Sequence, residues 1–221
     1  MAKALIFDFD GVVADSEVLA NTVLAEIVTE LGVPTTVEDS YRAYLGKRFS
    51  EILAEIDRTV GRQLPLSFGD QYQARTLDRF RRSLLPIAGV REFIARFDHV
   101  PRCIASSSSP DRLALCLDVM NMTSLFHGRV FSASNVERGK PYPDIFLHAS
   151  ASIGIPPNAC IVIEDSPSGV TAARAAGCTV VGLLAAGHIR EDHGAYLKKA
   201  GAHYLALDYL ETERIVAQLL D

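Results

Sequence analysis

The feature that most constrains the fold is a short apolar run that ends in two carboxylates. Residues 4–7 are continuously apolar, and Asp8, Phe9, Asp10 and Gly11 follow them. Such a run is typical of a central parallel strand covered on both faces, and parallel sheets bind ligands at the carboxyl ends of their strands. Because side chains alternate along an extended chain, Asp8 and Asp10 are predicted to point to the same side. Gly11 would let the backbone turn sharply or lie close to a ligand.

Two carboxylates at a strand end suggest several kinds of chemistry. One could attack an electrophile while the other moves a proton, or both could hold a hard cation such as Mg²⁺. Asp and Gly are also common in turns that end strands, so this stretch alone does not decide between a site and a turn.

The region after this strand has a helical pattern. Its first apolar residues recur at steps of three and four: Val18, Leu19, Val23, Leu24, Ile27, Val28 and Leu31. The pattern predicts helices over residues 15–31, from residue 37, over 50–60 and over 70–85, with a loop over 64–69. An all-helical insertion of about 70 residues is therefore expected.

After Pro86 short apolar strands alternate with helices. The strands are predicted at residues 102–105, 129–132, 160–163, 179–183 and 204–206. This alternation predicts an α/β fold with a doubly wound, Rossmann-like parallel sheet. The predicted domains are an α/β core, residues 1–14 and 84–221, and an inserted helical domain, residues 15–83.

Further polar residues follow other predicted strands. They are Ser106 and Ser107, Lys140, and the pair Glu164 and Asp165. Each could be a helix cap, a turn or a solvated loop residue. The carboxyl ends of parallel strands lie at the same edge of a sheet, however, so these residues are expected to converge with Asp8 and Asp10.

The electrostatics of converging carboxylates indicate what this edge of the sheet could bind. Two like charges ~4 Å apart repel by roughly 4 kcal/mol at an effective dielectric constant near 20, so four carboxylates need a cation and form a natural Mg²⁺ site. With Mg²⁺ and Lys140 present, an anionic phosphate could bind, and backbone N–H groups at a helix start could hold its oxygens. The residues predict phosphoryl transfer to a carboxylate.

Four motifs resemble those of the haloacid dehalogenase superfamily of hydrolases. They are Asp8-Phe9-Asp10-Gly11-Val12-Val13-Ala14-Asp15-Ser16-Glu17, Ile104-Ala105-Ser106-Ser107, Gly139-Lys140-Pro141-Tyr142-Pro143-Asp144-Ile145-Phe146 and Ile163-Glu164-Asp165-Ser166-Pro167-Ser168-Gly169. They occur in the family's order and span nearly the whole chain. The chain is similar to the subgroup with a helical cap after the first strand, which includes β-phosphoglucomutase-like sugar phosphatases and phosphoglycolate phosphatases.

The resemblance implies a role for each matching residue. Asp8 would attack phosphorus, and Asp10 would protonate the leaving oxygen and later help to activate water. Mg²⁺ would be held by the Asp8 carboxylate, the Asp10 backbone carbonyl and Asp165, with Glu164 in direct or water-mediated support. Ser106, Ser107 and Lys140 would bind the phosphoryl oxygens. The cap would close over the site, exclude water and select the substrate.

Other activities of the family fit less well. A dehalogenase lacks the second carboxylate and a phosphonatase has a small residue there, whereas this chain has Asp10. A β-phosphoglucomutase has a histidine where this chain has Ala20 and an arginine where it has Phe49, so mutase activity stays an alternative to phosphatase activity. A receiver domain also forms an aspartyl phosphate, but its acidic pair and its phosphorylated Asp are placed differently.

Two further segments contain basic or titratable side chains. In the helical insertion, Gly46, Lys47 and Arg48 could present cations to the substrate, or they could form a surface turn. In the polar segment after Gly187, His188 and His193 are expected at the surface.

Composition limits the partners and the compartment. A net charge of −5 argues against general nucleic-acid binding, and a span without formal charge, 145–163, is broken by prolines and is not expected to cross a membrane. The four cysteines are expected to be free thiols in a reducing compartment. The expectation is a cytoplasmic monomer or weak homodimer that acts on a small phosphorylated metabolite and binds neither nucleic acid nor membrane.

Overall fold

The computed structural model describes residues 3–44, 49–126 and 128–221. The chain forms two compact units, one of Met1–Asp15 with Leu85–Asp221 and one of Ser16–Leu84. The roles of these two units as catalytic core and cap stay predictions.

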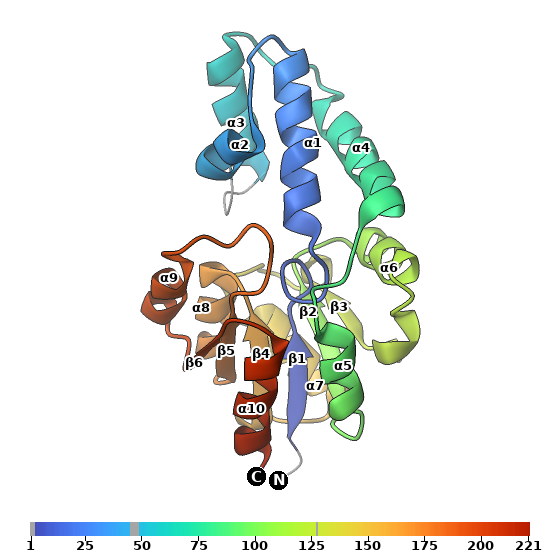
Figure 1. Ribbon diagram of the computed structural model, residues 1–221, viewed down its shortest axis with the longest axis vertical. Helices are drawn as coiled ribbons and strands as arrows, with labels where there is room; N and C mark the ends of the chain where they lie inside the picture. The colour runs from blue at the N-terminus through green and yellow to red at the C-terminus, as the bar shows by residue number, and fades with distance from the viewer. Residues whose placement is uncertain (1–2, 45–48, 127) are drawn as a thin grey trace. The chain divides into compact units, whose positions relative to one another are not determined.

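The larger unit contains a parallel sheet of six strands in the order β3-β2-β1-β4-β5-β6 (Figure 1). The strands are β1 (Ala4–Phe7), β2 (Arg102–Ser106), β3 (Val130–Ser132), β4 (Cys160–Glu164), β5 (Thr179–Leu183) and β6 (Tyr204–Ala206). Its helices are α5 (Val90–Arg96), α6 (Pro110–Val119), α7 (Asp144–Ile153), α8 (Pro167–Ala175), α9 (His193–Ala200) and α10 (Tyr209–Leu220). The strand order reverses beside β1, so this is the doubly wound, Rossmann-like α/β fold that the sequence predicted.

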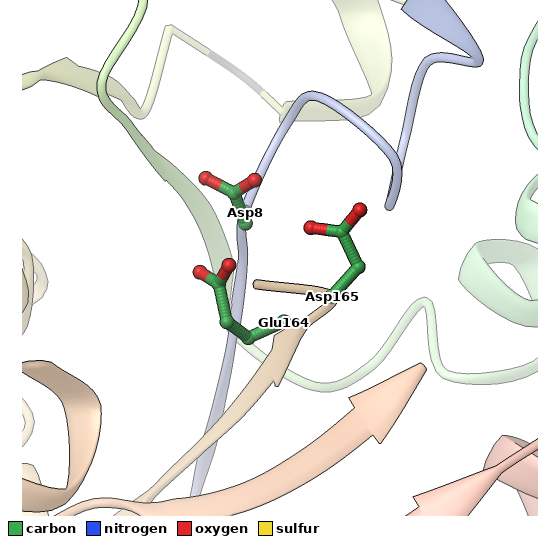
Figure 2. A group of neighbouring side chains, drawn as sticks. All are labelled: Asp8, Glu164 and Asp165. Carbon is green, nitrogen blue, oxygen red and sulfur yellow. The ribbon is translucent and has the colours of Figure 1, made fainter. Parts of the chain in front are cut away.

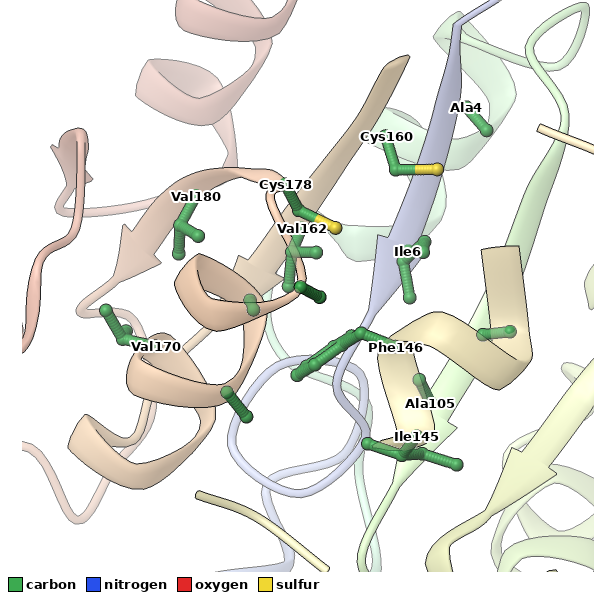
Figure 3. Close-up of a cluster of buried hydrophobic side chains, with 14 of the residues drawn as sticks. Ala4, Ile6, Ala105, Ile145, Phe146, Cys160, Val162, Val170, Cys178 and Val180 are labelled. Atoms are coloured by element: carbon green, nitrogen blue, oxygen red, sulfur yellow. The ribbon is translucent and has the colours of Figure 1, made fainter. Parts of the chain in front are cut away.

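The central strand is buried on both faces, as its apolar run predicted. One face of the sheet packs against α7 and α8 through a cluster that includes Ile6, Val162 and Phe146 (Figure 3). On the other face the ring of Phe7 packs edge-on against Phe93 of α5, with ring centroids 5.9 Å apart. This double cover fixes the position of β1 and therefore of the residues that follow it.

The register of the sheet aligns the carboxyl ends of the strands that carry the site. Phe7 of β1 pairs with Ile104 of β2 and with Ile163 of β4. The residues after these positions include Asp8, Ser106 and Glu164, and all three lie at one edge of the sheet. The convergence that the sequence predicted at this edge is therefore present for these three residues.

Among its described residues, 16–44 and 49–84, the smaller unit has four helices: α1 (Ser16–Glu30), α2 (Val37–Tyr44), α3 (Phe49–Val60) and α4 (Phe68–Ser83). Its core gathers apolar residues of α1, among them Leu24 and Val28, with Tyr44, Ile56 and Phe68. The expected loop over 64–69 was wrong at its end, because α4 begins at Phe68, whose ring is buried in this core. Within the described residues, no helix is both long and apolar enough to span a bilayer.

Candidate active site

Three carboxylates meet at the carboxyl ends of β1 and β4 (Figure 2). Asp8 directly follows β1, Glu164 ends β4, and Asp165 comes next. One oxygen from each lies within 4.8 Å of the others, and the three residues are 7%, 0% and 4% exposed, respectively. The Asp8 N–H also donates to the carbonyl of Ile163 at 2.9 Å, which ties the end of β1 to β4.

Lys140 supplies a positive charge to this cluster. Its Nζ lies 2.5 Å from Asp8 Oδ1 and 2.8 Å from Glu164 Oε2, and its side chain is 5% exposed. The same ammonium lies 5.0 Å from the ring centroid of Phe146. The lysine that the sequence placed in a loop between β3 and α7 is therefore a buried bridge between two carboxylates.

The surroundings of Asp8 disfavour its charged form. Burial raises the pKa of Asp8 well above its usual value, the negative charges of Glu164, Asp165 and Asp10 raise it further, and Lys140 opposes them. Burial lowers the pKa of Lys140, but Asp8 and Glu164 outweigh burial, so the net pKa of the lysine is raised. The ammonium therefore stays charged, while Asp8 needs positive charge nearby to ionise readily.

Two glycines make room for the acidic side chains. Gly11 has a φ of +78°, and a Cβ there would lie 1.8 Å from Asp165 Oδ2. A Cβ at Gly169, in the first turn of α8, would lie 2.1 Å from the carboxyl carbon of Glu164. The left-handed backbone at Gly11 agrees with the sharp turn expected there, and its close approach is to the Asp165 side chain.

Asp10 is held by partners from the segment after β2. Its two carboxylate oxygens accept hydrogen bonds from Ser108 Oγ and Arg112 Nη2, each at 2.6 Å. Sequence reasoning missed both donors. Ser108 belongs to the four-serine run, but Arg112 is 102 residues from Asp10, and no local pattern marks it as a partner.

The predicted phosphate-binding serines differ in their surroundings. Ser106 is the last residue of β2, is fully buried, and accepts a hydrogen bond from the Ser108 N–H at 3.0 Å. Ser107 is exposed. Ser109 caps α6, its Oγ accepting from the Arg112 N–H at 3.4 Å, so the serine run is also a helix start, as expected.

The expectation that His188 lies at the surface was wrong. His188 is 5% exposed, and its Nε2 lies 3.3 Å from Asp165 Oδ2. His193 is half-buried, and its Nε2 lies 2.5 Å from the backbone carbonyl oxygen of Asp165. The segment after β5 looked like solvated loop because it is polar, but it packs against the end of β4.

The candidate substrate-binding residues of the helical unit, Gly46, Lys47 and Arg48, lie outside the described residues. Their role stays a prediction.

The acidic cluster fits a hard divalent cation. Asp8, Glu164 and Asp165 offer three converging carboxylate oxygens, the ligand type that Mg²⁺ and Ca²⁺ prefer. Lys140 bridges Asp8 and Glu164, and a divalent cation would supply the further positive charge that three ionised carboxylates in one cluster need. Glu164 is the least available of the three, because its Oε1 accepts from both the N–H and the Oγ of Ser166 and its Oε2 from Lys140.

Comparison with known proteins agrees with this geometry. A family model described as haloacid dehalogenase-like hydrolase matches residues 5–183. A probable pseudouridine-5'-phosphatase of Drosophila melanogaster is 37% identical over 188 residues, 80% of this chain and 79% of that protein. A phosphorylated carbohydrates phosphatase of Thermotoga maritima is 31% identical over 205 residues, 90% of this chain and 92% of that protein.

A solved structure adds a likeness over almost the full chain. It is a HAD family hydrolase from Deinococcus radiodurans with bound phosphate and sodium, 32% identical, with a TM-score of 0.85 over 99% of this chain and 96% of that one. Another relative is much longer than this chain. Protein SUPPRESSOR OF QUENCHING 1, chloroplastic, from Arabidopsis thaliana is 30% identical over 201 residues, and the chain spans 19% of that protein. With its parallel sheet, its acidic cluster and a family match over most of its length, the chain belongs to the haloacid dehalogenase-like hydrolases.

Proposed function

We propose that the protein is a Mg²⁺-dependent phosphatase that hydrolyses a small phosphorylated metabolite through an aspartyl-phosphate intermediate. The observation that carries this proposal is the Lys140 bridge between Asp8 and Glu164, with Asp165 beside it. This arrangement supports the proposal, because the carboxylate proposed as the nucleophile, a positive charge and the oxygens proposed to hold the cation lie in one buried cluster.

In the first half-reaction an Asp8 carboxylate oxygen attacks phosphorus, and the bond from phosphorus to the ester oxygen breaks. In this step Asp10 starts in its protonated form and gives its proton to that oxygen, so the alcohol leaves neutral and Asp8 carries the phosphoryl group as an acyl phosphate. In the second half-reaction Asp10 accepts a proton from water as the water oxygen attacks phosphorus. Phosphate leaves, and Asp8 regains its carboxylate.

Other residues hold the reacting groups. Lys140 and the Ser106 hydroxyl would bind phosphoryl oxygens, and Ser108 and Arg112 fix the Asp10 carboxylate. A cation held by Asp8, the Asp10 carbonyl and Asp165, supported by Glu164, would neutralise charge on the phosphoryl group. The helical unit is proposed to act as the cap that selects the substrate.

The relatives' names suggest where to look for that substrate. They include a phosphatase of phosphorylated carbohydrates and a probable pseudouridine-5'-phosphatase, which points to sugar phosphates and to phosphorylated nucleosides. A screen of such compounds, ranked by kcat/KM, would identify the preferred class. A β-phosphoglucomutase would instead convert one phosphosugar isomer into another with little net release of phosphate.

We expect p-nitrophenyl phosphate to be hydrolysed in the presence of Mg²⁺ and not in its absence. EDTA should lower steady-state phosphate release by at least ~10²-fold, because the cation supplies several kcal/mol of charge stabilisation in reactions of this kind, and added Mg²⁺ should restore it. Full activity in EDTA, after passage of the protein over a chelating resin, would contradict the metal dependence.

Replacing Asp10 with alanine should slow turnover at least ~10²-fold, as expected for loss of a general acid. Mg²⁺ affinity should stay close to wild type, because the backbone carbonyl assigned to the cation remains. The measurements are kcat with a substrate that has a poor leaving group and a Mg²⁺ titration by calorimetry. Asp111→Ala, at an exposed position in the first turn of α6, is the matched control. Near-normal turnover of Asp10→Ala would show that Asp10 is not the proton donor.

A further inference from the structure

Two histidines from one segment bracket Asp165, which the proposed mechanism uses as a metal ligand. His188 lies between β5 and α9, and its Nε2 is 3.3 Å from Asp165 Oδ2. His193 begins α9, and its Nε2 is 2.5 Å from the Asp165 backbone carbonyl oxygen. One ring therefore contacts the side chain of Asp165, and the other contacts its main chain.

The segment that carries these rings is itself anchored. The Gly187 N–H donates to Asp15 Oδ1 at 3.2 Å, which ties the turn to the loop after β1. The Ile189 N–H donates to the Ala186 carbonyl at 3.0 Å, and Arg190 donates to the Gly187 carbonyl at 3.1 Å. These hydrogen bonds hold the backbone on both sides of His188 and so restrain the position of its ring beside Asp165.

Gly11 shows how closely these groups pack. A Cβ at this position would lie 1.8 Å from Asp165 Oδ2 and 3.0 Å from His188 Cε1. The Gly11 backbone, the carboxylate and the imidazole therefore occupy adjoining space, with no room for another side chain. The His188 ring is buried as part of this packing, which argues against direct contact with a substrate.

The chemistry of these contacts determines what the histidines can do. A carbonyl oxygen only accepts hydrogen bonds, so His193 Nε2 must carry a proton in this contact and donate a hydrogen bond to the Asp165 carbonyl oxygen. His188 Nε2 lies 3.3 Å from Oδ2, and an N–H on this nitrogen would restrain rotation of the carboxylate and so direct its other oxygen. Figure 2 shows one Asp165 oxygen directed toward the side of Asp8. Partners of this kind orient ligands and typically change metal affinity 10–100-fold when they are removed.

We infer that His188 and His193 are positioning residues for Asp165 and that they set the affinity of the acidic cluster for a divalent cation. The inference rests on the proposed function only in taking this cluster as the metal site. It is measured by cation binding alone, without substrate and without turnover.

The test compares two replacements of His188 with different hydrogen-bonding ability. His188→Leu keeps an apolar side chain but removes the donor, whereas His188→Gln keeps an N–H near the position of Nε2. Binding of Mn²⁺ to the substrate-free protein is followed by loss of the electron paramagnetic resonance signal of free Mn²⁺. His188→Leu should raise the Kd about 10–100-fold, and His188→Gln should stay within about threefold of wild type. His99→Ala, at an exposed position, is the matched control and should have the wild-type Kd.

Thermal melts separate positioning from a merely structural role. A positioning role predicts that His188→Leu loses part of the rise in Tm that Mn²⁺ produces, because ligand stabilisation depends on the Kd. A structural role predicts a lower Tm with the Mn²⁺-induced rise unchanged. If His188→Leu does not fold, the same comparison is made with His193→Leu and His193→Gln. His193 is only half-buried, so its replacement disturbs the packing less.

The outcomes distinguish this inference from the proposed function. The positioning role would be overturned if the leucine variants kept the wild-type Kd for Mn²⁺, or if the glutamine variants lost as much Mn²⁺ affinity as the leucine variants. Either result would count even if the enzyme is an active phosphatase. Conversely, wild-type protein that binds Mn²⁺ but hydrolyses no phosphate ester would overturn the proposed function. In that case, a higher Kd for Mn²⁺ in His188→Leu and a near-wild-type Kd in His188→Gln would still uphold the positioning role. Wild-type protein that binds no Mn²⁺ would overturn the inference.

Discussion

Replacing Asp8 with asparagine should abolish turnover and, at the same time, raise the Tm of the metal-free protein. Turnover should fall by ~10³-fold or more, because the amide cannot form the acyl phosphate and removal of a nucleophile has effects of this size in other enzymes. Stability should rise because burial and the neighbouring carboxylates disfavour a negative charge at this position, which asparagine does not carry.

The sign of the pH dependence follows from the pKa of Asp8. Folding raises this pKa well above the usual 3.8, so the folded protein binds the proton more tightly than the unfolded chain does. The stability contributed by protonated Asp8 is fully present below pH 3.8 and is lost as the pH rises through the folded-state pKa. Asparagine removes this loss, so the gain in Tm over wild type should grow from acid toward neutral pH.

The measurement is a pair of thermal melts in EDTA, at pH 5 and at pH 8, for wild type and for Asp8→Asn. Each kcal/mol gained corresponds to ~2–4 °C in a chain of this size. Asp111→Asn, at an exposed position, is the matched control and should leave Tm and turnover nearly unchanged. Retained turnover in Asp8→Asn would remove the covalent mechanism, and a lower Tm at pH 8 would contradict the electrostatic account.

Replacing Lys140 with methionine should have the opposite effect on stability and also impair turnover. Methionine has a similar length but no charge, so Asp8 and Glu164 would lose the ammonium that bridges them. Leaving buried charges without their partner typically costs ~3–5 kcal/mol, which corresponds to a fall in Tm of roughly 10 °C. One carboxylate should take up a proton in compensation, so the loss should be smaller at low pH.

Turnover of Lys140→Met should fall for two reasons. The phosphoryl group loses a positive charge, and the pKa of Asp8 rises further because Lys140 is the group that lowers it. We expect a loss of at least ~10²-fold at neutral pH, with the acidic limb of the pH–rate profile displaced to higher pH. Lys199→Met, at an exposed position in α9, is the control. If Lys140→Met kept both Tm and turnover within error of wild type, the bridge would have no role in the site.

The sequence identified those parts of the site that depend on local pattern. The apolar run before Asp8 could be recognised as a buried strand, and so could the run before Glu164. Parallel strands share an edge, so these patterns were enough to predict that the acidic residues converge there. The alternation of strands and helices predicted the fold in the same way.

The errors occurred where a distant contact decides burial. The loop predicted over 64–69 ends earlier because Phe68 is buried in the core of the helical unit. His188 was expected in solvent because its neighbours in sequence are polar, yet it is buried beside Asp165, 23 residues away. Neither contact can be recognised from the periodicity or the composition of the neighbouring sequence.

Strand periodicity and parallel topology were enough to predict from the sequence that Asp8, Glu164 and Asp165 lie at one edge of the sheet. The pairing of each carboxylate with its basic partner is seen in the folded protein and not in the sequence: Lys140 with Asp8 and Glu164, Arg112 with Asp10, His188 with Asp165. The physical reason is that these partners lie between 23 and 132 residues apart, and the direction of a side chain across such a distance is set by packing, not by local pattern.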